Sequence, residues 1–187
     1  MGSNIETRLY KLIEKKQDLK EFEQWVYSTP ELEDFLSPEN YLDLISLNYS
    51  ESGAWYEIQK IILRTIDVSD FEAWRLTKAL RSIVAKDENQ VDSILEMYDF
   101  YCRGYNFLQE LGLNYGLCLE VPSSVHGKEC FSELTQSEVE TIVSGFYLSI
   151  EREAKKVLAW IENKEIIPNG YDDENYFTYT DNRSKAK

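Results

Sequence analysis

The sequence predicts an all-α fold, a single compact helical domain of about seven to eight helices that is not a solenoid. Gly and Pro together number 12 in 187 residues, so few positions interrupt regular structure. Apolar residues recur at three- and four-residue spacing along most of the chain, and several of these runs begin with a helix-capping side chain. These observations favour helices packed around a core.

The chain is expected to open with a helix that begins near Ser3, where Glu6 completes a capping box, and that runs to about Lys16. Apolar side chains at helical spacing predict a second helix over residues 18–27. This helix has to end before Pro30, because the residue that precedes a proline disfavours helical geometry.

Two short helices are predicted next, because the sequence repeats one start signal. Thr29-Pro30-Glu31 and Ser37-Pro38-Glu39 each combine a capping hydroxyl, a proline at the first helical position and an acid in the first turn. The helices should cover residues 30–36 and 38–48.

The middle of the chain predicts two further helices. Residues 50–53 form a break, after which a strongly apolar helix is expected over residues 55–66. Ser69 is the expected cap of the next helix, since Glu72 stands at the capping-box position. A polar turn at residues 86–89 should end it.

The clearest helical pattern predicts a helix from Asn89 or Gln90 to Leu111, with Gly112 as its C-terminal glycine. Residues 112–134 are then expected to form one long irregular loop. A loop of this length inside a compact domain is usually functional or ordered by its own packing.

Thr135 and Glu138 predict a capping box at the start of a last long helix that reaches about Ile161. The predicted helical domain covers residues 1–168. The remaining segment, 169–187, should be an acidic, aromatic tail that packs on the domain or is partly disordered; its aromatic residues are Tyr171, Tyr176, Phe177 and Tyr179.

The sequence contains no recognisable catalytic, cofactor or metal signature. The motifs of a nucleophile elbow, a phosphate-binding loop, a dinucleotide site and a zinc protease are all absent. His126, the only histidine, has no companion nucleophile or ligand and is interpreted as an ordinary loop residue. The three cysteines, Cys102, Cys118 and Cys130, have no CxxC spacing. This pattern indicates buried free thiols and no metal site.

The net charge restricts the partners. Lys and Arg number 20 against 34 Asp and Glu, which gives −14. Nucleic acids and anionic lipids are bound through Lys and Arg, so direct binding of nucleic acid or of a membrane surface is not expected. No apolar run resembles a signal peptide near the N-terminus, and the sequence therefore predicts a cytoplasmic protein.

The negative charge is concentrated in one part of the sequence. Residues 18–59 contain ten acids and one base, which gives −9. Carboxylates interleaved with aromatic residues are typical of a surface that attracts a basic partner, although solubility alone also explains an acidic surface. The candidate contact residues are Glu31, Glu33, Asp34, Glu39, Asp43, Tyr49, Glu51 and Tyr56, and of the aromatic residues Tyr49 and Tyr56 are expected to be the more exposed.

Five segments carry a resemblance to a known class of proteins: residues 22–27, 41–49, 104–108, 112–117 and 179–183. In these the chain resembles the small immunity proteins that bacteria encode beside polymorphic or contact-dependent toxins. The resemblance implies a cytoplasmic, non-enzymatic inhibitor, monomer or homodimer, that binds one cognate toxin domain. It assigns no functional residue.

The charge adds that the toxin is a basic protein, such as a nuclease with a basic groove. Two alternatives stay open at this point. One is an acidic adaptor or a regulatory protein that mimics DNA. The other is an enzyme that uses the loop at residues 112–134.

Overall fold

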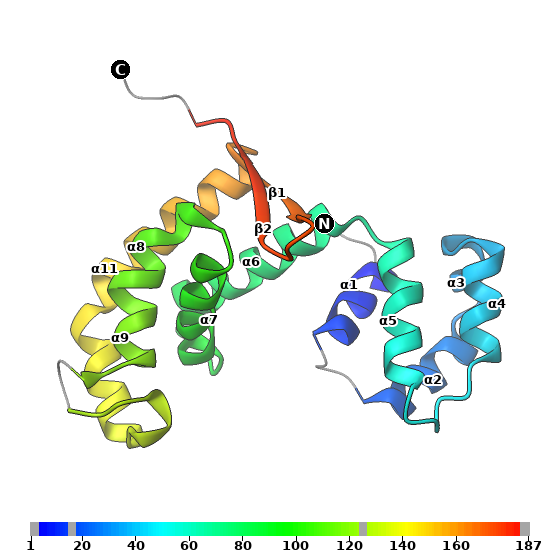
Figure 1. Ribbon diagram of the computed structural model, residues 1–187, viewed down its shortest axis with the longest axis horizontal. Coiled ribbons are helices and arrows are strands. Elements are labelled where there is room, and N and C mark those ends of the chain that lie inside the picture. Colours follow the sequence, from blue (N-terminus) through cyan, green and yellow to red (C-terminus); the bar gives the residue numbers. More distant parts are fainter. Residues whose placement is uncertain (1–3, 15–17, 124–126, 184–187) are drawn as a thin grey trace. The chain divides into compact units, whose positions relative to one another are not determined.

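The computed structural model describes residues 4–14, 18–123 and 127–183, and these are mostly helical (Figure 1). The prediction of a mainly helical chain is confirmed, but the described residues also form a two-stranded sheet that the sequence did not predict. Internal contacts divide the chain into two compact units, Met1–Phe71 and Glu72–Lys187, a division that was not predicted either. We call them the N-terminal unit and the C-terminal unit.

The N-terminal unit contains helices at the five predicted places, but the start signal predicted for the third is wrong, because Pro30 is its N-cap and not its first residue, and no side chain caps it. The helices are α1 (Asn4–Ile13), α2 (Leu19–Ser28), α3 (Glu31–Phe35), α4 (Pro38–Ser46) and α5 (Ala54–Thr65). The predicted cap at Ser3 and the predicted end at Lys16 lie outside the described residues.

The core of the N-terminal unit is apolar. Each helix contributes aliphatic or aromatic side chains that are almost fully buried, among them Leu9, Leu12, Phe22, Leu32, Leu44, Ile58 and Ile62. Burying such side chains stabilises the fold by about 1.5–3 kcal/mol each relative to leaving them in water. The helices are therefore fixed by their apolar stripes, and the opposite sides of α3 and α4 are left to solvent.

Helix α6 (Val68–Ala85) begins one residue earlier than its predicted cap, Ser69. The side chain of Asp67 accepts the backbone N–H groups of Ser69 and Asp70, at 2.7 and 3.3 Å, so Asp67 is the cap. Glu72 is fully buried and does not serve a capping box at the surface. The prediction failed because Asp67 and Ser69 are both good caps and their local spacing does not decide between them.

Helix α7 (Gln90–Cys102) ends nine residues before the predicted position. The chain turns at Gly104, whose φ is +122°, and the carbonyl oxygen of Phe177 lies 2.5 Å from where a Cβ would stand. Tyr105 extends the apolar spacing of α7 although it belongs to the following segment, where it is buried. The periodic pattern therefore continued across a turn.

The predicted irregular loop at residues 112–134 is wrong in its first third. Residues 106–120 are helical, in the order η1 (Asn106–Leu108), α8 (Gln109–Leu111), the π-helical turn η2 (Gly112–Gly116) and α9 (Leu117–Glu120). Figure 1 shows this run beside α7. A Cβ at Gly112 would lie 2.8 Å from the Tyr101 Cβ, and one at Gly116 would lie 2.8 Å from the Ile94 oxygen. The glycines thus allow close packing and do not end a helix.

The last long helix follows its prediction. Helix α11 (Gln136–Glu162) starts at a capping box in which Thr135 accepts the Glu138 N–H and the Glu138 carboxylate accepts the Thr135 N–H. A short 3₁₀ turn, η3 (Phe131–Glu133), precedes it. Seven buried aliphatic side chains line the inner face of α11.

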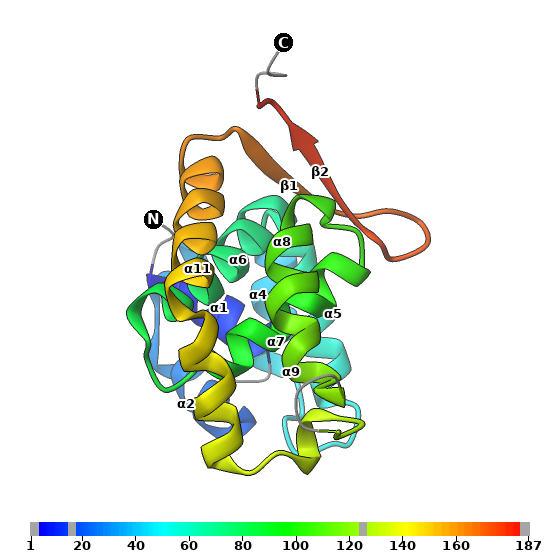
Figure 2. The ribbon, with the colours of Figure 1, turned by 90° about the vertical axis from the view of Figure 1, so that its left-hand side faces the viewer.

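The C-terminal segment forms an antiparallel hairpin of β1 (Ile166–Tyr171) and β2 (Phe177–Asp181), which Figure 2 shows following the end of α11. The register pairs Ile166 with Asp181 and Tyr171 with Phe177, and it shifts by one residue between Pro168 and Gly170. Phe177 is 3 % exposed and stacks on Tyr105, with ring centroids 4.6 Å apart. The hairpin is thereby attached to the helices of its own unit.

Candidate functional site

The acidic residues of α3 and α4 are presented to solvent because the other sides of these helices are buried. Leu32 of α3 and Leu44 of α4 are fully buried in the core. Ser37 caps α4 by accepting the Asn40 N–H at 3.2 Å, and Pro38 occupies the first turn, as predicted. This local structure places four carboxylates on the exposed surface of adjacent helices: Glu31, Glu33, Asp34 and Glu39.

We call the exposed surface of these two helices the acidic face, defined by Glu31, Glu33, Asp34, Glu39, Leu42 and Asp43. Within the described part of the chain, the first four acids make no ion pair. Asp43 differs, because its carboxylate lies 3.6 Å from the Arg64 guanidinium of α5. An unpaired exposed carboxylate keeps its full charge available to a cationic partner.

Two further predicted residues lie around the start of α5, Glu51 in the turn before it and Tyr56 in its first turn. Glu51 is exposed, and one of its oxygens accepts a hydrogen bond from the Asn48 amide at 3.0 Å. Tyr56 is 63 % exposed, as expected, and the Lys60 ammonium lies 5.2 Å from the centre of its ring. Lys60 also pairs with Glu57 at 3.1 Å, so the positive charge here is already shared within the helix.

Tyr49 is not exposed, which corrects the expectation from the sequence. Its side chain is 7 % exposed, and its hydroxyl donates to the Leu44 carbonyl oxygen at 3.0 Å. Burial, followed by the negative charges of Tyr27 and Glu23 on ionisation, raises its pKa. The ring packs near Phe22, with centroids 6.3 Å apart. A residue in a predicted turn gives no periodic signal of its burial, so only the tertiary structure shows that Tyr49 belongs to the core.

Besides Leu63 of α5, which is 45 % exposed, two apolar residues that the sequence did not single out are exposed in the same unit. Tyr27 at the end of α2 is 60 % exposed, and Leu42 of α4 is 59 % exposed. Leu42 stands between Glu39 and Asp43 in the sequence. Its place opposite Leu44 on the predicted helix was the signal that could have identified it.

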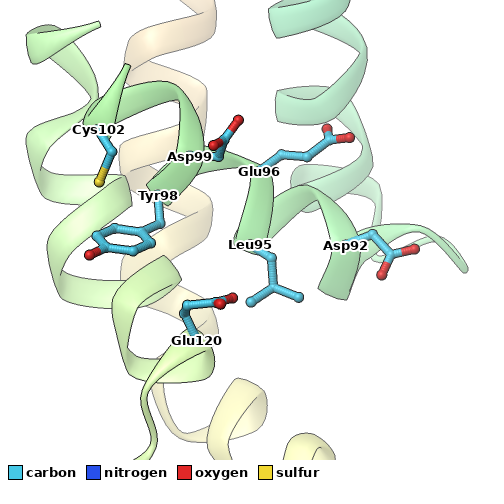
Figure 3. Close-up of a pocket in the computed structure, with 7 residues that line it drawn as sticks. All are labelled: Asp92, Leu95, Glu96, Tyr98, Asp99, Cys102 and Glu120. Carbon is cyan, nitrogen blue, oxygen red and sulfur yellow. The ribbon is translucent and has the colours of Figure 1, made fainter. Parts of the chain in front are cut away.

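A second acidic surface lies in the C-terminal unit, where α7 and α9 line a pocket of about 510 Å³. Figure 3 shows Leu95 and Tyr98 of α7 near Glu120 of α9, with Asp92 at one end. The other lining residues are Glu96, Asp99 and Cys102. A hydrogen bond with Cys102 is the largest cause that raises the pKa of Tyr98, and the Glu120 charge adds to it.

The pocket does not have the geometry of a metal centre. Nowhere in residues 4–14, 18–123 and 127–183 do three or more His, Cys, Asp or Glu side chains converge to hold a metal ion. Asp99 already lies 3.8 Å from the Arg103 guanidinium. His126 lies outside the described residues.

The cysteines only partly match their prediction as buried free thiols. All three are free, but Cys102 is exposed, and Cys118 and Cys130 are partly exposed. Cys102 is the last residue of α7 and lines the open pocket, whereas its predicted place was the interior of a longer helix. The early end of α7 therefore explains its exposure.

The only carboxylate of the C-terminal unit that is fully buried among the described residues, Glu72, has a structural role. Its oxygens accept from Tyr171 at 2.8 Å and from Tyr105 at 3.3 Å, and they pair with Arg75 at 2.6 Å. Burial, followed by the charge of Glu72, raises the pKa of Tyr171 to about 12, so its hydroxyl remains a donor at neutral pH. The cluster fastens the hairpin to α6.

Comparisons of the chain with protein-family models, with curated proteins and with solved structures found no match. Among the described residues, no helix combines the length and the apolar character needed to cross a membrane.

Proposed function

We propose that this protein is an immunity protein that binds and neutralises a cognate bacterial toxin domain through the acidic face. The single observation that carries the proposal is the group of four exposed carboxylates, on adjacent helices, that have no ion pair within the described residues. The resemblance of five segments to immunity proteins supports the same function. The partner is a basic protein, and the inhibitor acts without catalysis in the cytoplasm.

The physical basis is electrostatic complementarity. A nuclease presents Lys and Arg along the groove that holds its polyanionic substrate, so a surface of unpaired carboxylates attracts the same groove. Such attraction increases the association rate at low salt and is screened as the ionic strength rises. The inhibitor then excludes the substrate by occupying its place.

The proposal is tested with two variants that change the net charge equally. Glu31→Gln/Glu33→Gln/Asp34→Asn/Glu39→Gln neutralises the acidic face. Glu88→Gln/Glu129→Gln/Asp173→Asn/Glu174→Gln neutralises four exposed acids of the C-terminal unit and is the matched control. Both variants retain the size and shape of the replaced side chains.

The experiment has two stages. The tagged protein is purified from the native bacterium, and a copurifying toxin domain is identified by mass spectrometry. The toxin is then expressed in a heterologous bacterial host together with each variant, and survival is measured. We expect the control variant to protect the host and the acidic-face variant to lose protection at least tenfold. Equal protection by both variants, or no toxin domain among the partners, would contradict the proposal.

A further inference from the structure

Two exposed apolar side chains of the N-terminal unit, Leu42 of the acidic face and Tyr27 of α2, have no role in the charge attraction described above. A single exposed apolar side chain is common on soluble proteins. Two on one flank of a helix are less easily explained, because each leaves apolar area in contact with water. Their geometry relative to α4 decides whether they form one surface.

Helix α4 presents its two flanks to different neighbours. Asp43 lies on the flank towards α5, because it pairs with Arg64 there. Each residue of a helix is rotated by about 100° from the one before it, so Leu42 and Ile45, which are three residues apart, lie on one side of α4 and point away from the Asp43 flank. Tyr27 belongs to α2, and its hydroxyl donates to the Ile45 carbonyl oxygen of α4 at 3.1 Å. Leu42 and Tyr27 therefore share the flank of α4 that is remote from α5.

Tyr27 is exposed and yet held in place. Its hydroxyl is fixed by the bond to Ile45, and its ring lies edge-on to the buried Tyr49, with centroids 6.5 Å apart. The neighbouring Ser46 directs its hydroxyl to the Leu42 carbonyl oxygen at 2.6 Å, so this polar group is already satisfied. A rigid aromatic side chain loses little conformational entropy on binding, and this property is common in the residues that dominate interface energies.

We propose that Leu42 and Tyr27 are the apolar anchors of the docking surface, and that its occupant is a basic segment of the partner protein in which an apolar side chain is flanked by Lys or Arg. The charge complementarity of the adjoining Glu31, Glu33, Asp34 and Glu39 selects this occupant. The acids increase the rate of association, and the anchors slow dissociation. This inference rests on the proposed function only in naming the toxin as the natural partner.

The anchors are tested with synthetic probes that do not require the toxin. The first is a 14-residue amphipathic peptide of Lys and Leu, and the second replaces every Leu by Ser at the same charge. Binding to the ¹⁵N-labelled full chain is followed by NMR, and kinetics are measured by biolayer interferometry. We expect the Lys/Leu peptide to shift the amide signals of Tyr27, Leu42 and their neighbours, and the Lys/Ser peptide to bind at least tenfold more weakly.

Leu42→Ser and its matched control, Leu148→Ser, separate the anchor from general apolar attraction. Leu148 is 81 % exposed on α11 of the C-terminal unit. We expect Leu42→Ser to raise the dissociation rate of the Lys/Leu peptide about tenfold with an unchanged salt dependence of association. Leu148→Ser should change neither rate. Both serine variants should keep the wild-type amide pattern outside the substituted helix, which excludes misfolding as the cause.

The inference is wrong if Leu42→Ser and Leu148→Ser behave alike, or if the shifted amides lie away from α2 and α4. Its failure differs from that of the proposed function. If the acidic-face variant loses host protection while Leu42→Ser changes neither host protection nor peptide binding, the anchor inference is wrong and the proposed inhibitor function stands. If the peptide binds at Leu42 but no toxin is neutralised, the anchor inference stands and the proposed inhibitor function is wrong.

Discussion

The N-terminal unit and the C-terminal unit have equal net charges but arrange their carboxylates differently. Fourteen acidic and seven basic residues give the first unit −7, and 20 acidic and 13 basic residues give the second −7. In the C-terminal unit many acids are paired within the unit, for example Glu151 with Lys155 at 2.5 Å and Glu162 with Arg81 at 2.9 Å. Other exposed acids of the C-terminal unit, such as Glu88 and Glu129, also have no ion pair in the described chain, but they lie in separate segments. The acidic face of the N-terminal unit gathers four such acids on two adjacent helices. The clustering of unpaired acids, more than net charge, distinguishes a surface that can attract a partner.

The interiors of the two units also differ. The N-terminal core is apolar, and the Tyr49 hydroxyl makes a buried hydrogen bond within it to the Leu44 carbonyl oxygen. The C-terminal unit contains the fully buried Glu72, whose partners are Arg75, Tyr105 and the partly exposed Tyr171, and Phe177 packs against Arg75. Arg75 lies 5.0 Å from the centre of the Phe177 ring and 4.6 Å from that of Phe100. The position of the hairpin therefore depends on the Glu72–Arg75 charge pair, whereas the helices that carry the acidic face are held by apolar side chains.

The largest effect is expected for Glu72→Ala. Removing one member of a buried pair leaves the other charge and two hydroxyls without their partner, which costs about 3–5 kcal/mol of unfolding free energy. The matched change is Glu162→Ala, whose pair with Arg81 is mostly exposed and contributes less than about 1 kcal/mol. Urea denaturation followed by circular dichroism measures both. Similar losses in the two variants would show that the buried cluster adds no stability.

Glycine replacements should give effects of opposite sign. In Gly116→Ala the new methyl group meets the Ile94 oxygen and the Tyr98 Cβ at 2.8 Å, and overpacking of this kind costs about 1–3 kcal/mol. Gly145→Ala on α11 has no atom within 4 Å and should stabilise the helix by about 0.5–1 kcal/mol. Thermal melting of the two variants checks the signs. A stabilising Gly116→Ala would mean that η2 does not pack closely on α7.

A smaller effect distinguishes the acidic face from the four dispersed acids of the C-terminal control variant, and it requires no partner. Unpaired carboxylates repel one another, so the acidic-face variant should melt at a higher temperature than the wild type in low salt. The difference should disappear at high salt, where the charges are screened. The matched C-terminal variant should gain less. Equal gains would indicate that the clustered acids of the acidic face repel one another no more than the dispersed control acids do.

The smallest effect concerns Asp87 in the turn after α6. The Ser82 hydroxyl, at 2.5 Å, and the Asn89 N–H, at 2.9 Å, lower its pKa from the usual value of 3.8. A lowered pKa adds stability above the unfolded value, and this stability is lost as the pH falls through the folded value. The urea midpoint of the wild type should therefore decrease below about pH 4 more steeply than that of Asp87→Asn. Ser82→Ala should flatten the profile in the same direction, and an unchanged profile in both variants would contradict the assignment.

Much of the N-terminal unit could be predicted because its signals are local. Ser37 followed by Pro38 places the start of α4 correctly, and the apolar stripe of α5 identifies the buried side of that helix. The exposed carboxylates of α3 then follow from the burial of Leu32 between them. The exposure of a candidate residue could therefore be predicted from the sequence wherever that residue lies in a helix with a clear apolar stripe.

The failures occurred where a contact distant in sequence decides the local structure. The end of α7 depends on Gly104, which faces the backbone of Phe177. The hairpin depends on the same contact and on Glu72, since Tyr171 is 99 residues away from the carboxylate that it binds. Short strands with Gly, Pro and polar residues give a weak alternating pattern, so the tail showed no strand signal.

The sequence by itself determined the mainly helical fold, the net charge of −14 and the concentration of acids in residues 18–59. These properties follow from composition and from spacing along the chain. Only the tertiary structure decided that Tyr49 lies in the core, that Leu42 and Tyr27 share one flank of α4, and that Gly112 and Gly116 join two helices. Burial and pairing depend on which surfaces meet, because residues far apart in the chain supply the atoms that cover a side chain or neutralise its charge.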